Sequence, residues 1–351
     1  MDQAAIEIGK RWLGAMEERG GLPRPDWGRV QRRWWSLPEG VQPAAWTAVE
    51  WVWQHALAEA WRKRSGGENS GGTGGSSESG DGNSGGGGFR VVERGECLLT
   101  TDLDDVEAER TAVFMGRALG TIERCLTGLG LPEFSDGGPG LDVAVVCREV
   151  EDYLDYVSDA HEADHVGAVS GGMCLHDGSV HVAAHGRSAG VLGPVLAHEL
   201  AHSRLAGLGL PVWLEEGLVV HLEKAVVPNE DFENDLHTVA QHRRFWTPGR
   251  LGAFFGGEVF CGADDAEGLP YALAYSIVGE LMRSDAERFA EFIKAASWED
   301  GGAGACVALY GQAPEGLIPR FIRDAAEANA GSVDDHDITD ELSDGPDTLE
   351  D

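Results

Sequence analysis

The sequence lacks any run of about 18 apolar residues, the length that a helix needs to cross a bilayer. Its first residues, MDQAAIEIGKRWLG, lack the apolar stretch of a secretion signal and place an acidic residue at position 2. We therefore expect no membrane partner and a cytoplasmic location. The six cysteines form no C-x-x-C pair, which argues against a zinc knuckle or a redox motif, and we expect reduced thiols.

Basic residues are also few. The chain has 27 Lys and Arg against 60 Asp and Glu, a net charge of −33. Such a charge repels the phosphates of nucleic acids, so no nucleic-acid partner is expected. Residues 1–64 escape this imbalance, because they hold ten Lys and Arg against eight Asp and Glu. We expect the acidic surface to serve solubility, with attraction of a cationic substrate as the alternative.

Two segments lack apolar side chains or nearly so. Residues 65–88, SGGENSGGTGGSSESGDGNSGGGG, contain twelve Gly and six Ser, which is typical of a disordered flexible linker. Residues 331–351 contain nine acidic residues and no Lys or Arg, which predicts a disordered acidic tail. The pattern divides the chain into two bodies, residues 1–64 and residues 89–330.

Residues 1–64 hold eight of the eleven tryptophans. Apolar residues from position 46 to 61 recur every three or four residues, which predicts a helix. We interpret the segment as a small Trp-rich helical module with the indoles in its core. A docking surface for a protein partner is the alternative, because so small a unit can hardly bury eight indoles.

Residues 89–330 are predicted to form an α+β domain. Short buried strands are expected within 95–103 and 141–147, with a helix over 105–130 between them. The segment MCLHDGSVHVAA, residues 173–184, predicts two strands joined at an Asp-Gly turn. From position 191 onward the pattern is helical.

The pattern His-Glu-x-x-His occurs twice, as HEADH at 161–165 and as HELAH at 198–202. Two histidines four residues apart converge on one ion only on a helix, where the intervening Glu lies beside the metal as a potential proton acceptor. HELAH has apolar residues around it, a Gly-Pro pair at 193–194 that can open a helix, and glycines at 207 and 209 that end it. HEADH has no apolar stripe, and we interpret it as a chance match in a loop or helix end.

A second pair, His181 and His185, lies in a strand-like segment where side chains four apart do not converge. We interpret these residues as surface or cross-strand histidines. A catalytic zinc site needs a third protein ligand, and the next acidic residues after His202 are Glu215 and Glu216. A second amphipathic helix, VWLEEGLVVHLEKA at 212–225, would bring one of them back over the two imidazoles.

These motifs resemble the gluzincin metallopeptidases and, more closely, the bacterial peptidase MA-like proteins. The resemblance rests on His198-Glu199-x-x-His202 and Trp213-Leu214-Glu215-Glu216-Gly217. It implies a zincin-like fold with a zinc ion held by His198, His202 and the glutamate before the glycine, Glu216. Glu215 is the alternative third ligand.

The resemblance extends more weakly in both directions. Residues 170–184 are similar to the family's strand pair, whose edge strand aligns a peptide substrate. LPYALAYSIVGELM resembles the helix whose leading tyrosine stabilises the oxyanion, which makes Tyr271 the candidate and Tyr275 the second choice. No Gly-x-Met-Glu-Asn stretch is present, so recognition of a free amine is not supported. His221 is interpreted as a helix-face residue, with a supporting role at the metal as the alternative.

The resemblance thus implies a zinc-dependent peptidase that hydrolyses a peptide or protein substrate. Glu199 is the expected general base, and Tyr271 is expected to assist the developing oxyanion. The alternative is an inactive zincin-like protein that binds zinc or binds a partner through residues 1–64. The intact Glu199 favours the enzyme, because a structural metal site needs no base.

Overall fold

The structure is a computed structural model that describes residues 1, 3–67, 88–131, 140–160, 171–176, 178–228, 236–260 and 268–330. Its strands are β1 (Glu17–Arg19), β2 (Leu22–Arg24), β3 (Arg90–Arg94), β4 (Cys97–Thr101), β5 (Asp142–Cys147), β6 (Gly172–Leu175) and β7 (His181–His185). Its first helices are α1 (Gln3–Leu13), α2 (Trp27–Trp35), α3 (Gln42–Gly67), α4 (Asp105–Gly128) and α5 (Val150–Ala160). The later helices are α6 (Ala189–Leu205), α7 (Val212–Val226), α8 (Leu236–Phe245), α9 (Pro248–Gly256), α10 (Leu269–Ser284), α11 (Ala286–Ala295), α12 (Ala303–Tyr310) and α13 (Arg320–Asn329).

A five-stranded mixed sheet forms the centre of the molecule, with the strand order β3-β4-β5-β7-β6. β4, β5 and β7 run parallel, whereas β3 and β6 pair antiparallel with their neighbours at the two edges. The expected strands and the hairpin that joins β6 to β7 are confirmed. β3 was not predicted; it pairs with β4 through a two-residue turn in which Gly95 has a positive φ of 60°.

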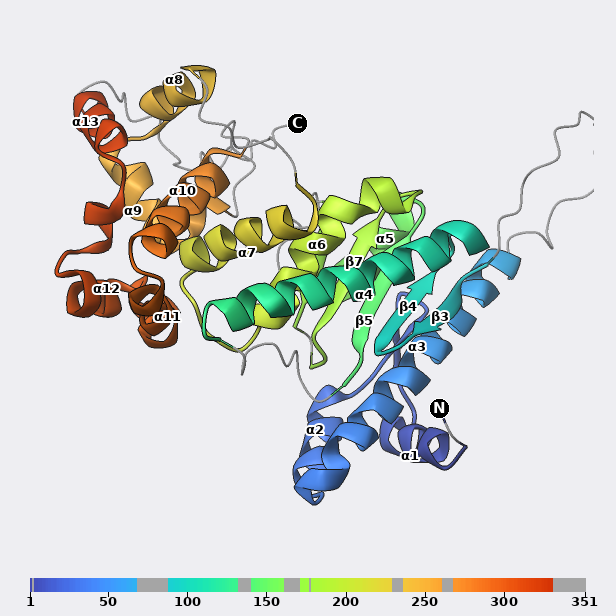
Figure 1. The fold of residues 1–351 in the computed structure, drawn as a ribbon. Helices are drawn as coiled ribbons and strands as arrows, with labels where there is room; N and C mark the ends of the chain where they lie inside the picture. Colours follow the sequence, from blue (N-terminus) through green and yellow to red (C-terminus); the bar gives the residue numbers. More distant parts are fainter. Residues whose placement is uncertain are drawn as a thin grey trace, which may run out of the picture.

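Alternate residues of the sheet serve two different cores. In β5, Ala144 and Val146 face one cluster, which also contains side chains of α4 and α6. Val145 and Cys147 face the other, which contains side chains of α3 and α5. The sheet is therefore a middle layer between two helical layers (Figure 1), as expected when both faces of short apolar strands are buried. This mixture of helices and a five-stranded mixed sheet is compatible with the predicted α+β class.

The N-terminal helices do not stand apart from the sheet. α3 contains the predicted helix, and its C-terminal half lies against the sheet, where Trp61 stacks on Phe89 with ring centroids 4.1 Å apart. Thr100 in β4 donates a hydrogen bond to Gln54 in α3 at 2.6 Å. This arrangement differs from the expected one, in which a linker separates residues 1–64 from residues 89–330. The sheet offers an apolar face on which part of α3, including Trp61, is buried.

The chain after β7 is helical, as predicted. α7 packs against both α6 and α4, and α10 packs against α7. Figure 1 shows α8 to α13 gathered on the side of the molecule away from α1 and α2. Among the described residues, no helix combines the length and apolar character that a membrane crossing requires. The predicted linker lies largely outside the described residues, as do the acidic tail and the HEADH segment at 161–165.

α6 begins earlier than the sequence indicated. Pro194 lies inside the helix, and the first residue of α6 is Ala189, with Ser188 at the N-cap. The backbone amides of Val191 and Leu192 donate to the Ser188 carbonyl and close the first turn before the proline is reached. Pro194 is the sixth residue of α6, beyond the first turn, so it removes the amide that would donate to the Gly190 carbonyl in a regular helix.

Candidate metal centre

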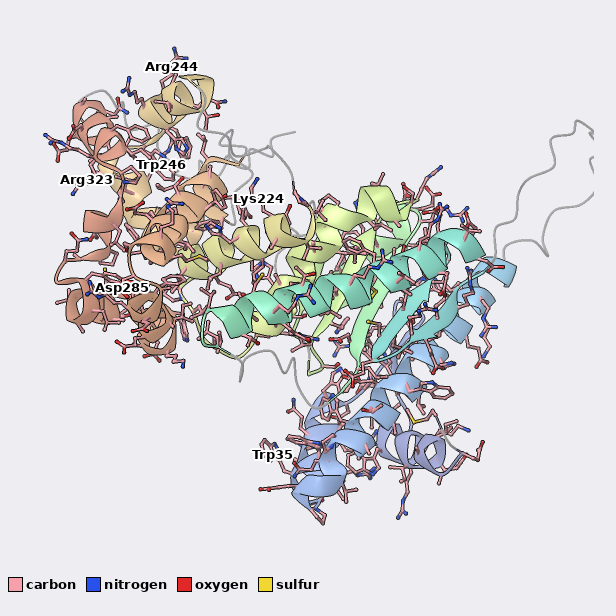
Figure 2. All side chains as sticks on the ribbon, viewed as in Figure 1. Trp35, Lys224, Arg244, Trp246, Asp285 and Arg323 are labelled. Carbon is pink, nitrogen blue, oxygen red and sulfur yellow. The ribbon has the colours of Figure 1, made fainter. Side chains whose placement is uncertain are left out.

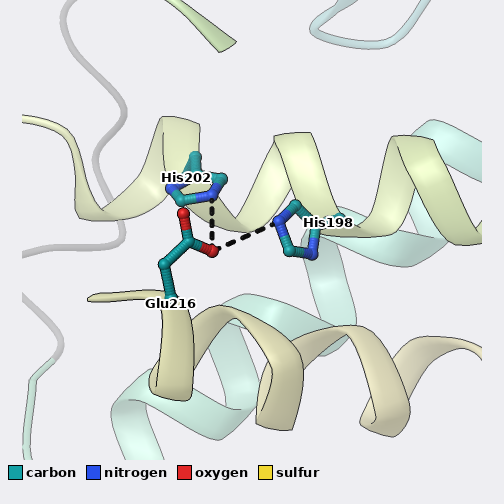
Figure 3. Close-up of side chains that lie close together, drawn as sticks. All are labelled: His198, His202 and Glu216. Carbon is teal, nitrogen blue, oxygen red and sulfur yellow. Dashed lines mark ion pairs between the residues drawn. The ribbon is translucent and has the colours of Figure 1, made fainter. Parts of the chain in front are cut away.

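Three side chains from two helices converge on one point. His198 and His202 lie one helical turn apart on α6, and Glu216 lies in the first half of α7. One ligand atom from each residue lies within 4.8 Å of the others, and this is the one such group of three or more His, Cys, Asp or Glu in the described chain. Figure 3 shows the Glu216 carboxylate between the two imidazole rings. The sequence-based ligand set is thus brought together, with Glu216 in the third position.

The separations suit a tetrahedral metal ion. The Nε2 atoms of His198 and His202 each lie 3.5 Å from the same oxygen, Oε2 of Glu216. Ligands at the usual 2.0–2.1 Å from zinc lie about 3.3 Å from one another at tetrahedral angles. Oε2 is also buried without a hydrogen-bond partner. Because an unsatisfied buried carboxylate oxygen is costly, the donor set fits a bound cation.

Two further carboxylates hold the imidazole rings from behind. Nδ1 of His202 lies 2.8 Å from Oε1 of Glu215, and Nδ1 of His198 lies 3.1 Å from Oε2 of Glu223. A carboxylate at Nδ1 places the proton there and leaves Nε2 free as a metal ligand. Glu215 is therefore a partner of His202 rather than the third ligand. Glu223 was missed, although it lies two helical turns after Glu216 on the same face of α7.

Four glutamates give the site a strongly negative field: Glu199, Glu215, Glu216 and Glu223. Burial opposes a charge on His198, but the nearby carboxylates of Glu216 and Glu223 outweigh it and raise the pKa of His198 to about 9. Burial likewise opposes ionisation of Glu216, yet the charges of His202 and His198 lower the pKa of Glu216 to about 2. The same field that favours protonated imidazoles favours a divalent cation between them.

Glu199 lies between α6 and the edge strand β6. Only 9% of the residue is exposed. Burial raises the pKa of Glu199, and the nearby His198 and His202 and a hydrogen bond from the Cys174 backbone oppose the rise. Gly172 permits this close approach, since a Cβ there would lie 3.2 Å from Cγ of Glu199 and 3.0 Å from the Ala183 carbonyl oxygen. A buried carboxylate with a raised pKa beside two imidazoles suits proton transfer.

A glycine after Glu216 brings α7 close to α10. A Cβ on Gly217 would lie 2.7 Å from the carbonyl oxygen of Ala274, so any side chain here would push the helices apart. The close approach places α10 beside the metal centre, where the ring centroid of Tyr271 lies 6.4 Å from that of His198.

Tyr275 faces a different neighbour on the same helix pair. Its ring stacks on His221 at a centroid distance of 4.0 Å, and Nε2 of His221 donates to the Tyr275 carbonyl at 2.9 Å. Of the two tyrosines, Tyr271 is thus the one beside His198. His221 joins α7 to α10, which agrees with its interpretation as a helix-face residue.

The other candidate histidines do not join the site. His181 is 2% exposed and lies under α3, so it is not a surface residue. Its place in β7, opposite Val143 and Leu175, fits the other half of the interpretation, a cross-strand histidine. Its Nδ1 bonds the Ser179 carbonyl at 2.9 Å and its Nε2 bonds the Tyr156 hydroxyl at 2.8 Å. His185 is half-buried beside Tyr153.

Comparison of the whole sequence with known proteins adds no relatives. No protein-family model matches the chain, and no curated protein matches it. The functional argument consequently rests on the geometry of α6, α7 and the strand beside them.

Proposed function

We propose that this protein is a zinc-dependent peptidase. The observation that carries the proposal is that the Nε2 atoms of His198 and His202 each lie 3.5 Å from Oε2 of Glu216. Glu215 and Glu223 behind the rings support it, because such outer carboxylates orient histidine ligands in metalloenzymes. The proposal includes a zincin-like fold, in which the mixed sheet lies before the two metal-binding helices.

His198, His202 and Glu216 would hold the ion. Zinc supplies an electrophile and lowers the pKa of adjacent water toward about 7. Glu199 takes the proton of the attacking water and passes it to the leaving amine. Tyr271 donates a hydrogen bond to the oxyanion that develops at the scissile carbonyl. An extended peptide is the proposed substrate, aligned along β6, which is the edge strand of the sheet next to Glu199.

The test compares the wild type with Glu199→Gln. Both proteins are loaded with zinc, assayed for metal content, and incubated with a peptide library derived from a whole proteome. The wild type is expected to bind one zinc ion and to cleave a subset of the peptides. Glu199→Gln is expected to bind the same ion and to cleave about a thousandfold more slowly, because general-base assistance is lost.

Two results contradict the proposal. Equal cleavage by both proteins would show that Glu199 is not the base. Zinc binding by a wild type that cleaves no peptide in the library, with the fold intact, would favour the inactive zincin-like protein instead. Removal of zinc with a chelator is the control: cleavage that persists after chelation comes from a contaminating protease that needs no metal.

A further inference from the structure

Three indoles meet at the surface of the N-terminal helices, on a part of the molecule that the proposed reaction does not use. Trp34 and Trp35 come from α2 and Trp46 comes from α3. The ring centroid of Trp34 lies 4.5 Å from that of Trp35 and 5.8 Å from that of Trp46. The ring planes cross at 67° and 68°, so Trp34 stands almost perpendicular to both neighbours. These three residues and Gln31 line a cavity of about 250 Å³.

The cavity has a fixed floor and an exposed rim. Trp46 is only 7% exposed, and its ring stacks on Trp27 at a centroid distance of 5.7 Å. Trp35 is 71% exposed, more than any other large apolar residue in the described part of the chain. Figure 2 shows Trp35 at the outer end of α2, away from α6 and α7. An aromatic cluster left open to solvent in this way is typical of a binding site.

The electrostatics of the cavity favour a positive ligand. The faces of indole rings are negative and attract cations. Nε1 of Trp46 donates to Oε1 of Glu50 at 2.8 Å, and this carboxylate acceptor shifts electron density toward the ring. Gln31, the one polar residue of the lining, is neutral.

Two arginines of α2 have partners outside the cavity. Arg33 donates from Nη1 to the Arg11 carbonyl at 2.8 Å, and Arg29 donates to the Leu13 carbonyl. Both guanidinium groups thus bind the C-terminal end of α1, where cations are favoured by the helix dipole. Neither of these bonds directs a guanidinium group into the cavity.

We propose that Gln31, Trp34, Trp35 and Trp46 form a binding site for an organic cation, the methylated ammonium or guanidinium end of a partner protein's side chain. Three mutually inclined aromatic walls hold such a group by cation–π attraction, and the cavity has room for the end of one side chain. The inference is independent of the metal centre and of peptide hydrolysis.

The test titrates the full-length protein with three probes and follows the indole N–H resonances by NMR. The probes are the amide of acetylated trimethyllysine, choline, and 3,3-dimethylbutan-1-ol, which has the shape of choline without its charge. Resonances of Trp34, Trp35 and Trp46 are expected to shift with the two cations. The neutral alcohol is expected to bind about tenfold more weakly than choline, because it lacks the cation–π attraction.

Three tryptophan variants give the matched comparison. Trp35→Ala removes the exposed wall and is expected to weaken binding of the trimethyllysine amide by about tenfold. Trp298→Ala removes another exposed indole, in the C-terminal helices, and is expected to leave binding unchanged. Trp35→Phe keeps an aromatic wall and should retain most of the affinity.

The outcomes separate the possibilities. Tighter binding of the trimethyllysine amide than of choline supports a protein side chain as the ligand, and the reverse order would replace it with a small free cation. Equal binding of choline and the neutral alcohol would overturn the proposal in favour of an apolar pocket. Absence of any shift, or equal binding by Trp35→Ala and the wild type, would also overturn it.

Discussion

Two buried polar clusters lie on opposite faces of the same sheet, and they differ in how their polar atoms are used. On the α3 face, Glu50 accepts hydrogen bonds from Nε1 of Trp46, Oγ of Ser179 and the Leu141 amide at 2.7–2.8 Å. His181, beside Ser179, has a partner at each ring nitrogen. Every atom of these two side chains that can form a hydrogen bond is engaged within the protein, as expected of a structural network.

On the α6 face, the two histidines have good hydrogen-bond partners only at their Nδ1 atoms, which point away from the metal centre. Carboxylates engage Nδ1 of His198 and of His202, while each Nε2 atom lies 3.5 Å from Oε2 of Glu216. The distance is too long for good hydrogen bonds and suits ligands around a common ion. The comparison teaches that buried polarity alone does not identify a metal centre. Unused ligand atoms that converge do.

The largest expected difference between the clusters is in metal binding. His202→Ala should abolish stoichiometric zinc binding, because it removes one of three ligands. His181→Ala, which also removes a buried imidazole, should keep the zinc and lower the melting temperature. Metal analysis of gel-filtered, folded protein and thermal unfolding measure the two effects. Loss of zinc from folded His181→Ala, or full zinc binding by His202→Ala, would contradict the assignment of metal binding to the α6 cluster alone.

The second expected difference is a pH-dependent stability from the α3 cluster. Burial raises the pKa of Glu50 from 4.5 to about 7, against its hydrogen bonds and with a contribution from the negative Asp142. The folded chain therefore holds this proton more tightly than the unfolded chain. The resulting stability is fully present below pH 4.5 and is lost as the pH rises through 7. A pKa difference of this size corresponds to about 3 kcal/mol in the free energy of unfolding.

Urea unfolding at a series of pH values measures this dependence. Glu50→Gln should remove the Glu50 contribution to the slope between pH 4.5 and 7, since the amide does not titrate. Glu59→Gln provides the control on the same helix, because Glu59 is exposed and pairs with Lys63 at the surface. An unchanged slope in Glu50→Gln would contradict the assignment of the raised pKa to this carboxyl.

The sequence was most informative where function and periodicity coincide. His198 and His202 share a helix face by spacing alone, and the apolar residues around them predict a buried helix. Glu215 and Glu216 became candidates because a second amphipathic helix follows a short loop, and the resemblance to the gluzincins favoured Glu216. The structure brings the Glu216 carboxylate between the imidazoles. These features depend on residues close in the chain, whose geometry a helix fixes.

Contacts between distant segments were not predictable in the same way. Trp61 and Phe89 stack across the predicted linker, but periodicity does not reveal which surface the indoles of α3 cover. The buried network of Glu50 and His181 was not predicted, because their partners come from segments far away in sequence, such as Leu141 and Tyr156. Glu223 lies on a predicted helix, yet its role depends on how closely α7 packs against α6.

The smallest expected effect is a loss of zinc affinity when Glu223, one of the two carboxylates behind the metal ligands, is replaced. Glu223→Gln keeps an oxygen that can accept from Nδ1 of His198 but removes the negative charge, so zinc affinity should fall about tenfold. Glu223→Ala also frees the ring to rotate and should cost more, up to about a hundredfold. Competition with a chromophoric chelator at constant pH measures both affinities, with exposed Glu280→Gln as the control. If both Glu223 variants bind zinc as tightly as the wild type, the carboxylate does not orient His198. If both bind zinc more weakly, the sizes of the two losses show whether the charge or the orientation of the ring matters more.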